Sequence, residues 1–408
     1  MTTPPTRYRQ TFTALTTLLT HWQWLWRPLP FMQQPVAWQT QWPELYARCL
    51  ALSDDTLAHL EATPPEHGDS AWRSLAEGLP LQRLQTLTDW PEALRGHAPS
   101  PGTAEGISER KWQQLHAYLQ AASPTQGTET DTHWVDWCAG KGHLAQLWAK
   151  HTTGPITALE YDAQLCQQGA DAAKTTSIEF VHQDVLDDSV IEHLHNHSHI
   201  LALHACGDLH RRAITLLSQT GQGLTLAPCC YHRTVDAHYR PLSAYAQQLS
   251  AQKALHLSRQ DLALAVQETV TAPGKVQQQR LTANAWRQGF DALQRHYRQH
   301  DEYLPIPSRG YRHLKDGFQA FCEWAAEQKS IALLASIDWP YWEQLGWQRY
   351  GDTRRLELVR HIFRRPLEIW LVLDRVIYLE EQGFDVTLTQ FCPRHLTPRN
   401  LLIRATRA

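Results

Sequence analysis

The N-terminal part of the chain has apolar positions spaced as they are on helices. Through residues 10–120, apolar side chains recur every three or four residues, as at Leu15, Leu18 and Leu19, and Pro-rich breaks separate the stretches. No strand pattern interrupts them, so we predict an N-terminal helical domain over residues 1–120. The tryptophans of this part follow the same spacing, which favours packing in a helical core over stacking on bases. They are Trp22, Trp24, Trp26, Trp38, Trp42, Trp72 and Trp90.

A polar stretch at residues 121–132, AASPTQGTETDT, predicts a linker, and the hydrophobic pattern changes after it. Short apolar runs then alternate with helical stretches up to residue 232. Because strands that alternate with helices form βαβ units, we predict a parallel, doubly wound, Rossmann-like sheet in an α/β domain over residues 133–408. The five strand candidates are HWVDWCAG, ITALEYD, SIEFVHQD, HILALHACGD and GLTLAPCCYH.

Helical patterns return at about residues 239–347, which we interpret as a helical insertion into the α/β domain. Residues 356–383 then predict one long helix. The runs FDVTLTQFC and NLLIRATR predict two strands that close the sheet with a C-terminal β-hairpin.

The composition narrows the class of protein. The chain has 408 residues, of which 42% are apolar, and its net charge of −3 provides no overall basic field for nucleic acid. Eight cysteines are too few for a disulfide scaffold, and Cys229 and Cys230 are adjacent, so we expect a reducing, cytoplasmic compartment. Neither an apolar run of about 18 residues nor a signal-cleavage pattern is visible, so we expect no membrane span and no secretion.

The sharpest motif is VDWCAGKGHL at residues 135–144, where a predicted strand runs into a glycine-containing turn and then an amphipathic helix. Glycines let the backbone approach a ligand, and the free N–H groups of a helix start attract a carboxylate or a phosphate. Glu160 ends the second strand, where a carboxylate can accept from both hydroxyls of a ribose. Asp184 ends the third strand and can accept from an adenine amino group. The motif therefore predicts a nucleotide-like cofactor.

Two cofactors fit this turn, because residues 140–145 also match the G-x-G-x-x-A pattern of dinucleotide binding. Asp136 would repel the pyrophosphate of NAD, whereas it can pair with the amino group of S-adenosylmethionine. A second nucleotide-binding half is not visible either. We therefore predict S-adenosylmethionine, with NAD as the alternative. The predicted cofactor-binding residues are Asp136, Cys138, Gly140, Lys141, Gly142, Glu160, Asp184, Val185 and His204.

The fourth and fifth strands end in HACGDL at residues 204–209 and PCCYHR at residues 228–233. Such positions border the ligand crevice of a doubly wound sheet, so this density of His, Cys, Tyr and Asp indicates a reactive centre. His232 can serve as a base, Tyr231 as an aromatic wall, or Cys229 as a nucleophile if its thiol pKa is lowered. The predicted catalytic residues are Cys229, Cys230, Tyr231 and His232. A purely structural role for the cysteines, as small residues at buried strand ends, is the alternative.

A metal site is a further alternative for the same two loops. The C-x2-C spacing typical of zinc sites is absent, and adjacent cysteines chelate one tetrahedral ion poorly. We therefore expect no metal. The ligands of such a site would come from His204, Cys206, Cys229, Cys230 and His232.

The strongest local basic segment lies near the C-terminus. From residue 345 onward, eleven arginines oppose seven acids, which gives a net charge of +4. The segment either contacts phosphates or forms a solvated helix face. Its densest part contains Arg349, Arg354, Arg355, Arg360, Arg364 and Arg365.

Several motifs occur in a fixed order between Ile107 and the C-terminus: ISERKWQQL, DWCAGKGHL, HACGDL, LAPCCYHR, PLEIWLVLDRVIYLEEQG and LTPRN. Together they resemble the methyltransferase-like group that includes the ribosomal RNA adenine dimethylase domain-containing protein. The HACGDL and CCYHR pair is also similar to the tRNA methyltransferase that modifies a ribose 2'-hydroxyl in the acceptor stem. The N-terminal helical part lies outside the resemblance.

The resemblance implies a class I S-adenosylmethionine-dependent methyltransferase. It also indicates RNA, either tRNA or rRNA, as a candidate substrate. One departure concerns the acceptor: the Asn-Pro-Pro-Tyr motif of amino-methylating enzymes is replaced by HACG at residues 204–207, which argues against adenine N6 methylation. The alternatives are a protein or small-molecule methyltransferase, a non-catalytic module that binds the donor, and an NAD-dependent oxidoreductase. The resemblance places Asp136, Gly140, Gly142, Glu160 and Asp184 at the cofactor.

Overall fold

The computed structural model describes residues 6–93, 107–123, 132–174, 177–221, 223–267, 274–333 and 336–407. Backbone contacts divide the chain into two compact units. Unit 1 comprises residues 1–20, 86–268 and 364–408, and unit 2 comprises residues 21–85 and 269–363. Within the described residues, no helix combines the length and the apolar character needed to cross a bilayer.

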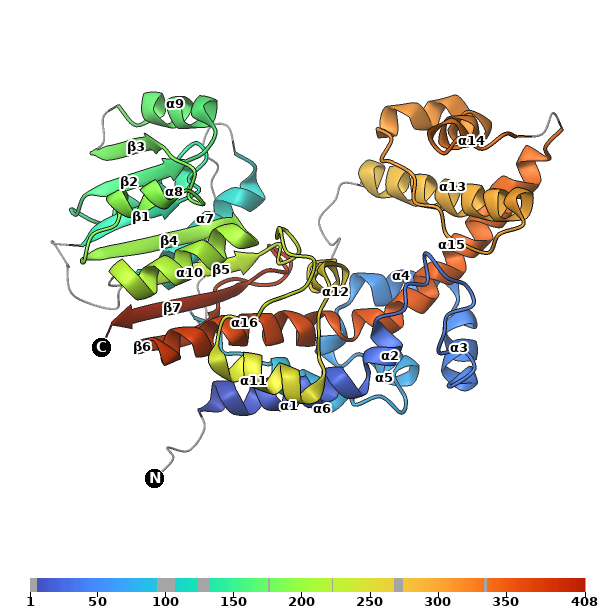
Figure 1. Cartoon of the computed structure of the whole chain (residues 1–408), viewed down its shortest axis with the longest axis horizontal. Coiled ribbons are helices and arrows are strands. Elements are labelled where there is room, and N and C mark those ends of the chain that lie inside the picture. Colours follow the sequence, from blue (N-terminus) through green and yellow to red (C-terminus); the bar gives the residue numbers. More distant parts are fainter. Residues whose placement is uncertain are drawn as a thin grey trace. The chain divides into compact units, whose positions relative to one another are not determined.

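Unit 1 contains a seven-stranded sheet in the order β3-β2-β1-β4-β5-β7-β6 (Figure 1). The first five strands run parallel, and β7 pairs antiparallel with both β5 and β6. The predicted α/β class, the doubly wound Rossmann-like sheet and the closing hairpin are confirmed. The strands are β1 His133–Trp137, β2 Ile156–Glu160, β3 Ile178–His182, β4 Ser198–Cys206, β5 Gly223–Cys229, β6 Phe384–Gln390 and β7 Leu401–Arg407.

Helices cover this sheet because its central strands are mostly apolar and buried, as is typical of parallel strands. Every residue of β1 and β5 is buried. Helices α7 and α8 pack into one apolar cluster with β1, β2 and β4, whereas α10 contacts β4 and β5, and α16 contacts β6. The helices of unit 1 are α1 Arg7–His21, α7 Glu109–Ala122, α8 His143–Trp148, α9 Ala163–Ala172, α10 Asp208–Thr220, α11 Ala244–Lys253, α12 Arg259–Leu264 and α16 Arg364–Glu381.

The helix predicted over residues 356–383 is in fact two helices. Helix α15 (Trp339–His361) ends in unit 2, and α16 begins at Arg364 in unit 1. The break precedes Pro366, whose ring would clash with the carbonyl of residue 362 in a continuous helix. The stretch between β3 and β4 also differs, because it forms only the 3-10 helix Asp188–His193.

The two units do not follow the predicted segments of the chain. Helices α1 and α7, from the predicted N-terminal helical domain, belong to unit 1. Phe12 of α1 stacks on Trp370 of α16, with ring centroids 4.9 Å apart. Helix α11, from the predicted insertion at residues 239–347, also belongs to unit 1, where Ser243 donates to Asp374. Of the predicted linker at residues 121–132, Ala121 and Ala122 end α7, and residues 124–131 lie outside the described residues.

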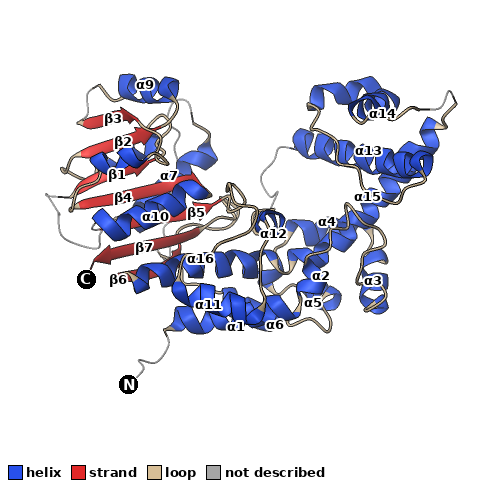
Figure 2. Ribbon diagram, in the orientation of Figure 1, coloured by secondary structure: helices blue, strands red, loops and turns tan. Residues whose placement is uncertain are grey.

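Unit 2 is helical (Figure 2), and helix α6 (Leu81–Thr88) ends just beyond its boundary. Helices α13 and α15 approach closely at Gly346, where an added Cβ would lie 2.5 Å from the carbonyl oxygen of Ala285. The tryptophan prediction is confirmed here for Trp26, Trp38 and Trp72, which are buried, whereas Trp22, Trp24 and Trp42 are half-buried and contact one another. The remaining elements of unit 2 are α2 Gln23–Trp26, α3 Pro43–Leu50, α4 Asp54–Ala62, the 3-10 helix Pro65–His67, α5 Ser70–Leu75, α13 Gly274–Arg298, the 3-10 helix Tyr311–Asp316 and α14 Gly317–Gln328.

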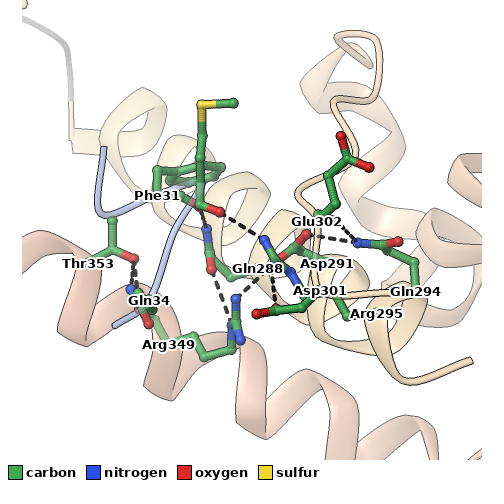
Figure 3. Close-up of polar contacts among 11 residues, drawn as sticks. Phe31, Gln34, Gln288, Asp291, Gln294, Arg295, Asp301, Glu302, Arg349 and Thr353 are labelled. Carbon is green, nitrogen blue, oxygen red and sulfur yellow. Dashed lines mark hydrogen bonds and ion pairs between the residues drawn. The ribbon is translucent and has the colours of Figure 1, made fainter. Parts of the chain in front are cut away.

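A buried carboxylate organises the polar interior of unit 2 (Figure 3). Asp291 is 1% exposed, and its Oδ2 accepts from Nε of Arg295 at 2.8 Å and from Nη2 of Arg349 at 2.9 Å. Its Oδ1 accepts from Gln294 at 3.1 Å, and Arg349 donates in turn to Gln288 at 3.3 Å. We call Asp291, Gln288, Gln294, Arg295 and Arg349 the Asp291 cluster.

Candidate active site

The turn between β1 and α8 requires its glycines for two different reasons. Gly142 has a φ of 68°, and a Cβ there would lie 2.3 Å from the ring of Phe180, so a side chain is excluded twice. Gly140 has a φ of 58°, but an added Cβ would meet nothing within 4 Å. The backbone at Gly140 therefore borders open space, as a turn that cradles a ligand requires.

Asp136 accepts a hydrogen bond from helix α8, which follows this turn. Its side chain is 2% exposed, and its Oδ2 accepts from the backbone N–H of Ala145 at 3.0 Å, near the start of α8. Burial raises the pKa of the Asp136 carboxyl to about 7, against the opposing effects of that hydrogen bond and of Lys111. The predicted pairing of Asp136 with a ligand amine stays a prediction, because the observed contact is with the helix start.

The predicted ribose-binding acid lies directly against the glycine turn. Oε2 of Glu160 accepts from the N–H of Gly140 at 2.7 Å, and Oε1 accepts from the N–H of Asp162 at 2.9 Å. Asp184 is half-buried, and its Oδ1 accepts from the N–H of Leu186 at 2.9 Å, beside the buried Val185. Both carboxylates are thus held in place by backbone donors at the carboxyl ends of β2 and β3.

Cys138 lies near all three of the predicted cofactor-binding acids. Burial raises the pKa of its thiol, and the negative charges of Glu160, Asp136 and Asp184 raise it further. All three predicted acids therefore lie close enough to one thiol to act on it. Cys138 also has a φ of 62°, a conformation that costs a residue with a Cβ about 1–2 kcal/mol.

The HACGDL loop lies near Cys138 and is hydrogen-bonded to the PCCYHR loop. Gly207 has a φ of 57°, and a Cβ there would lie 1.8 Å from the carbonyl oxygen of Arg233. Gly207 donates to the carbonyl of Cys229 at 3.1 Å, and Asp208 donates to that of Arg233 at 3.0 Å. His204 is exposed by surface area, yet desolvation by nearby protein atoms and the positive charges of Lys111 and Arg110 lower the pKa of its imidazole.

Three cysteines from the two loops come together. Sγ of Cys206 lies 3.6 Å from Sγ of Cys229, and the sulfurs of Cys206, Cys229 and Cys230 all lie within 4.8 Å of one another. Contacts with the neighbouring thiols lower the pKa of Cys230, with the positive charges of Arg399 and Arg233 adding to the effect. The same contacts and burial raise the pKa of Cys229, which does not favour the predicted nucleophile.

The other two predicted catalytic residues have different surroundings. Tyr231 is 3% exposed, its hydroxyl donates to the carbonyl of Pro228 at 3.4 Å, and the guanidinium of Arg375 lies 5.0 Å from its ring centre. It therefore packs inside the protein rather than forming a wall for a ligand. His232 is half-buried, and its Nδ1 is buried with no hydrogen-bond partner among the described residues. We call residues 136–142, Glu160, Asp184, the HACGDL loop and the PCCYHR loop the strand-end site.

Sequence reasoning missed two basic residues of α7. The charge of Lys111 acts on Asp136, His143 and His204, so this side chain lies near the strand-end site. The charge of Arg110 also acts on His204. Lysine is rare in this chain, with eight in 408 residues, so its scarcity is the one sequence signal that could have drawn attention to Lys111.

The arginine-rich segment at residues 349–365 does not form the predicted patch or solvated face. Its side chains instead fold inward, because each guanidinium pairs with a group of the protein itself. Arg360 and Arg365 are 3% and 2% exposed and pair with Glu357 and Glu368. The other partners are Asp291 for Arg349, Glu61 for Arg354, Asp54 for Arg355 and the carbonyl of Gln267 for Arg364.

Comparison with known proteins identifies the part of the chain that holds these residues. Residues 110–236 match a family model described as a methyltransferase domain. That span begins in α7 and includes the glycine turn, both acids and both loops. Comparison of the chain with curated proteins gave no match. The protein is therefore an S-adenosylmethionine-dependent methyltransferase, and its seven-stranded sheet is consistent with the Rossmann-like fold of such enzymes.

Proposed function

We propose that this methyltransferase acts on RNA and that the strand-end site holds the methyl donor. The observation that carries the substrate class is a set of exposed basic side chains beside the site. Arg110 and Lys111 come from α7, Lys141 from the glycine turn and Arg233 from the PCCYHR loop, and all four are exposed. None of them has an ion-pair partner among the described residues, so all four are available to phosphates.

The donor fits this site on two observations. The space beside Gly140 is open, and Glu160 lies against that backbone with a carboxylate that can accept from ribose hydroxyls. Asp184 and Val185, which follow β3, are the proposed contacts of the adenine. Bound S-adenosylmethionine would supply a methyl group from its sulfonium. Cys138, Lys141 and His204 complete the proposed set of donor contacts.

His232 is the proposed general base. An unpaired buried ring nitrogen costs about 1–3 kcal/mol, so His232 carries a cost that its internal contacts do not offset. As the bond between methyl carbon and acceptor atom forms and the carbon–sulfur bond breaks, the acceptor loses a proton, which the imidazole takes up. The loop also holds Cys229, Cys230 and Tyr231, whose burial and mutual contacts fit the role of positioning His232.

Labelled donor separates the RNA proposal from its rivals. A cell extract incubated with the protein and methyl-labelled donor should incorporate label into RNA, and nuclease digestion should leave it on one modified nucleoside. Label in the protein or small-molecule fraction alone would contradict the RNA proposal but not the enzyme class. The variant Lys111→Gln with Arg110→Gln should weaken RNA binding roughly equally across sequences and reduce its dependence on salt. Donor affinity should stay unchanged, and Lys150→Gln with Lys174→Gln serves as the matched control.

We also propose that the protein resides in the cytoplasm, a reducing compartment. All eight cysteines are free thiols, although several are close to one another. Labelling the protein in intact cells with a thiol reagent should therefore find the accessible cysteines reduced.

A further inference from the structure

The three sulfurs of the strand-end site form a group that methyl transfer does not require. Cys206, Cys229 and Cys230 contribute one Sγ each, and all three atoms lie within 4.8 Å of one another. In the described residues no other group of three potential metal ligands is this compact. The cluster therefore needs a separate explanation.

The fold brings these cysteines together in a way that the linear spacing does not show. Cys206 and Cys229 are register partners at the ends of the parallel strands β4 and β5, after an irregularity in β4. Cys230 follows Cys229 directly, so on a regular strand its side chain would point to the opposite face. Its φ of 48° breaks that alternation and turns its sulfur back toward the other two.

The Cys206–Cys229 separation matches that of two sulfurs in a tetrahedral thiolate site. With Zn–S bonds of about 2.3 Å, two sulfurs on the same ion lie roughly 3.8 Å apart. The Cys206–Cys229 separation of 3.6 Å is close to that value, and the third sulfur is within reach of the same centre. A disulfide bond would need the sulfurs at about 2.05 Å, well inside the observed separation.

The surroundings offset the charge of such a site. Three thiolates around a divalent cation carry one net negative charge. The charges of Arg233 and Arg399 both act on Cys230, and Nη1 of Arg399 is buried without a partner among the described residues. A buried guanidinium nitrogen that lacks an acceptor is costly, and a thiolate is an acceptor that it can use.

We propose that Cys206, Cys229 and Cys230 bind a zinc ion. Each thiol loses its proton to solvent as its sulfur coordinates the metal. Three protein ligands leave a tetrahedral ion with one further position, for water or another ligand. The ion cross-links the HACGDL and PCCYHR loops beside the donor pocket and so holds His232 in place. Metal binding itself depends on neither the donor nor RNA.

Differential alkylation of the full-length protein provides a test that needs no variant. The protein is stripped with a chelator under reducing conditions, reloaded with Zn²⁺ alone, and treated with an alkylating reagent before peptide mapping. We expect one bound zinc per chain by elemental analysis, and zinc-dependent protection of Cys206, Cys229 and Cys230. Cys138 and Cys166 should react equally with and without zinc. Equal reactivity of the three cysteines in both states, or no retained zinc, would overturn the proposal.

Variants then assign the ligands. Replacing any of the three cysteines by serine should weaken zinc binding by ~100-fold or more in a competition titration with a metal indicator. Cys166→Ser, which removes a buried thiol from α9, is the matched control and should bind zinc like the wild type. Cobalt loading should give the intense visible absorption of a tetrahedral thiolate site in the wild type. An intact mass two hydrogens lower without reductant, together with no metal uptake, would identify a disulfide pair and reject the zinc site.

Discussion

The Asp291 cluster of unit 2 and the strand-end site of unit 1 are both dense and polar, but they differ in how completely their groups are paired. In the Asp291 cluster every buried side-chain nitrogen and oxygen of the five residues has a partner. The strand-end site leaves Nδ1 of His232 unpaired and places Cys138, His204 and Cys230 at positive φ.

The difference separates a structural network from a functional one. Complete pairing reduces the cost of burying charge, so the Asp291 cluster links helices α13 and α15 and leaves no buried group unpaired for a ligand. Unpaired groups and unfavourable backbone conformations reduce stability, and they cluster where a protein binds ligands or carries out chemistry. Polar density alone does not distinguish the two regions.

The largest effect should come from the unpaired histidine. We expect His232→Asn to lower kcat about 10²–10⁴-fold, because the acceptor loses its base, while donor affinity and unfolding free energy change little. Single-turnover methyl transfer and urea unfolding measure the two quantities. His238→Asn, at an exposed position of the same unit, is the control. A loss of stability as large as the loss of rate would assign His232 to the structural class instead.

In unit 2 we expect a loss of stability with no change in donor affinity. Asp291→Ala leaves the half-buried Arg295 and Arg349 without their shared, buried carboxylate and should reduce the unfolding free energy of unit 2 by ~3–5 kcal/mol. Donor affinity, measured by calorimetry below the unfolding range, should not change. Asp301→Ala also removes a partner of Arg295, but the Asp301 side chain is 93% exposed, so this control should cost at most about 1 kcal/mol.

Asp136 is buried like Asp291 but belongs to the strand-end site. Its raised pKa predicts that the stability of the protein depends on pH. Its pKa of about 7 in the folded protein lies above the usual carboxyl value of 3.8, so the folded state binds the extra proton. The contribution of this proton to the free energy of unfolding is therefore fully present below about pH 4, and it is lost as the pH rises to about 7. Without donor, Asp136→Asn should be more stable than the wild type by ~2–4 kcal/mol at pH 8 and equal to it near pH 4. A constant difference across this range would contradict the proposed burial penalty.

The smallest effect should be at the ribose contact. Glu160→Gln keeps an acceptor for the N–H of Gly140 but removes the charge, so we expect donor affinity to fall about 10–100-fold with little change in stability. Glu179→Gln, at an exposed position of β3, should bind the donor like the wild type. Calorimetric titration of both variants measures this, and an unchanged affinity for Glu160→Gln would remove the residue from the donor site.

The order of elements in unit 1 could be predicted because its signals are local. Each strand is an apolar run with a turn signal after it, and the carboxyl ends of parallel strands meet at one edge of the sheet. Glu160, Asp184 and the two loops were therefore expected near the glycine turn, and the structure places them there. The single helix expected over residues 356–383 was wrong, although Pro366 marked the break.

By itself, then, the sequence determined the sheet, its class and the strand ends at which the candidate site residues lie, because these depend on periodicity over a few residues. Tertiary structure alone decided how distant segments pair. The arginines of residues 349–365 bind acids as far away as Glu61, and Cys206 meets Cys229 and Cys230 only because two strands lie side by side. Such contacts depend on chain geometry rather than on spacing along the sequence, so no linear motif records them.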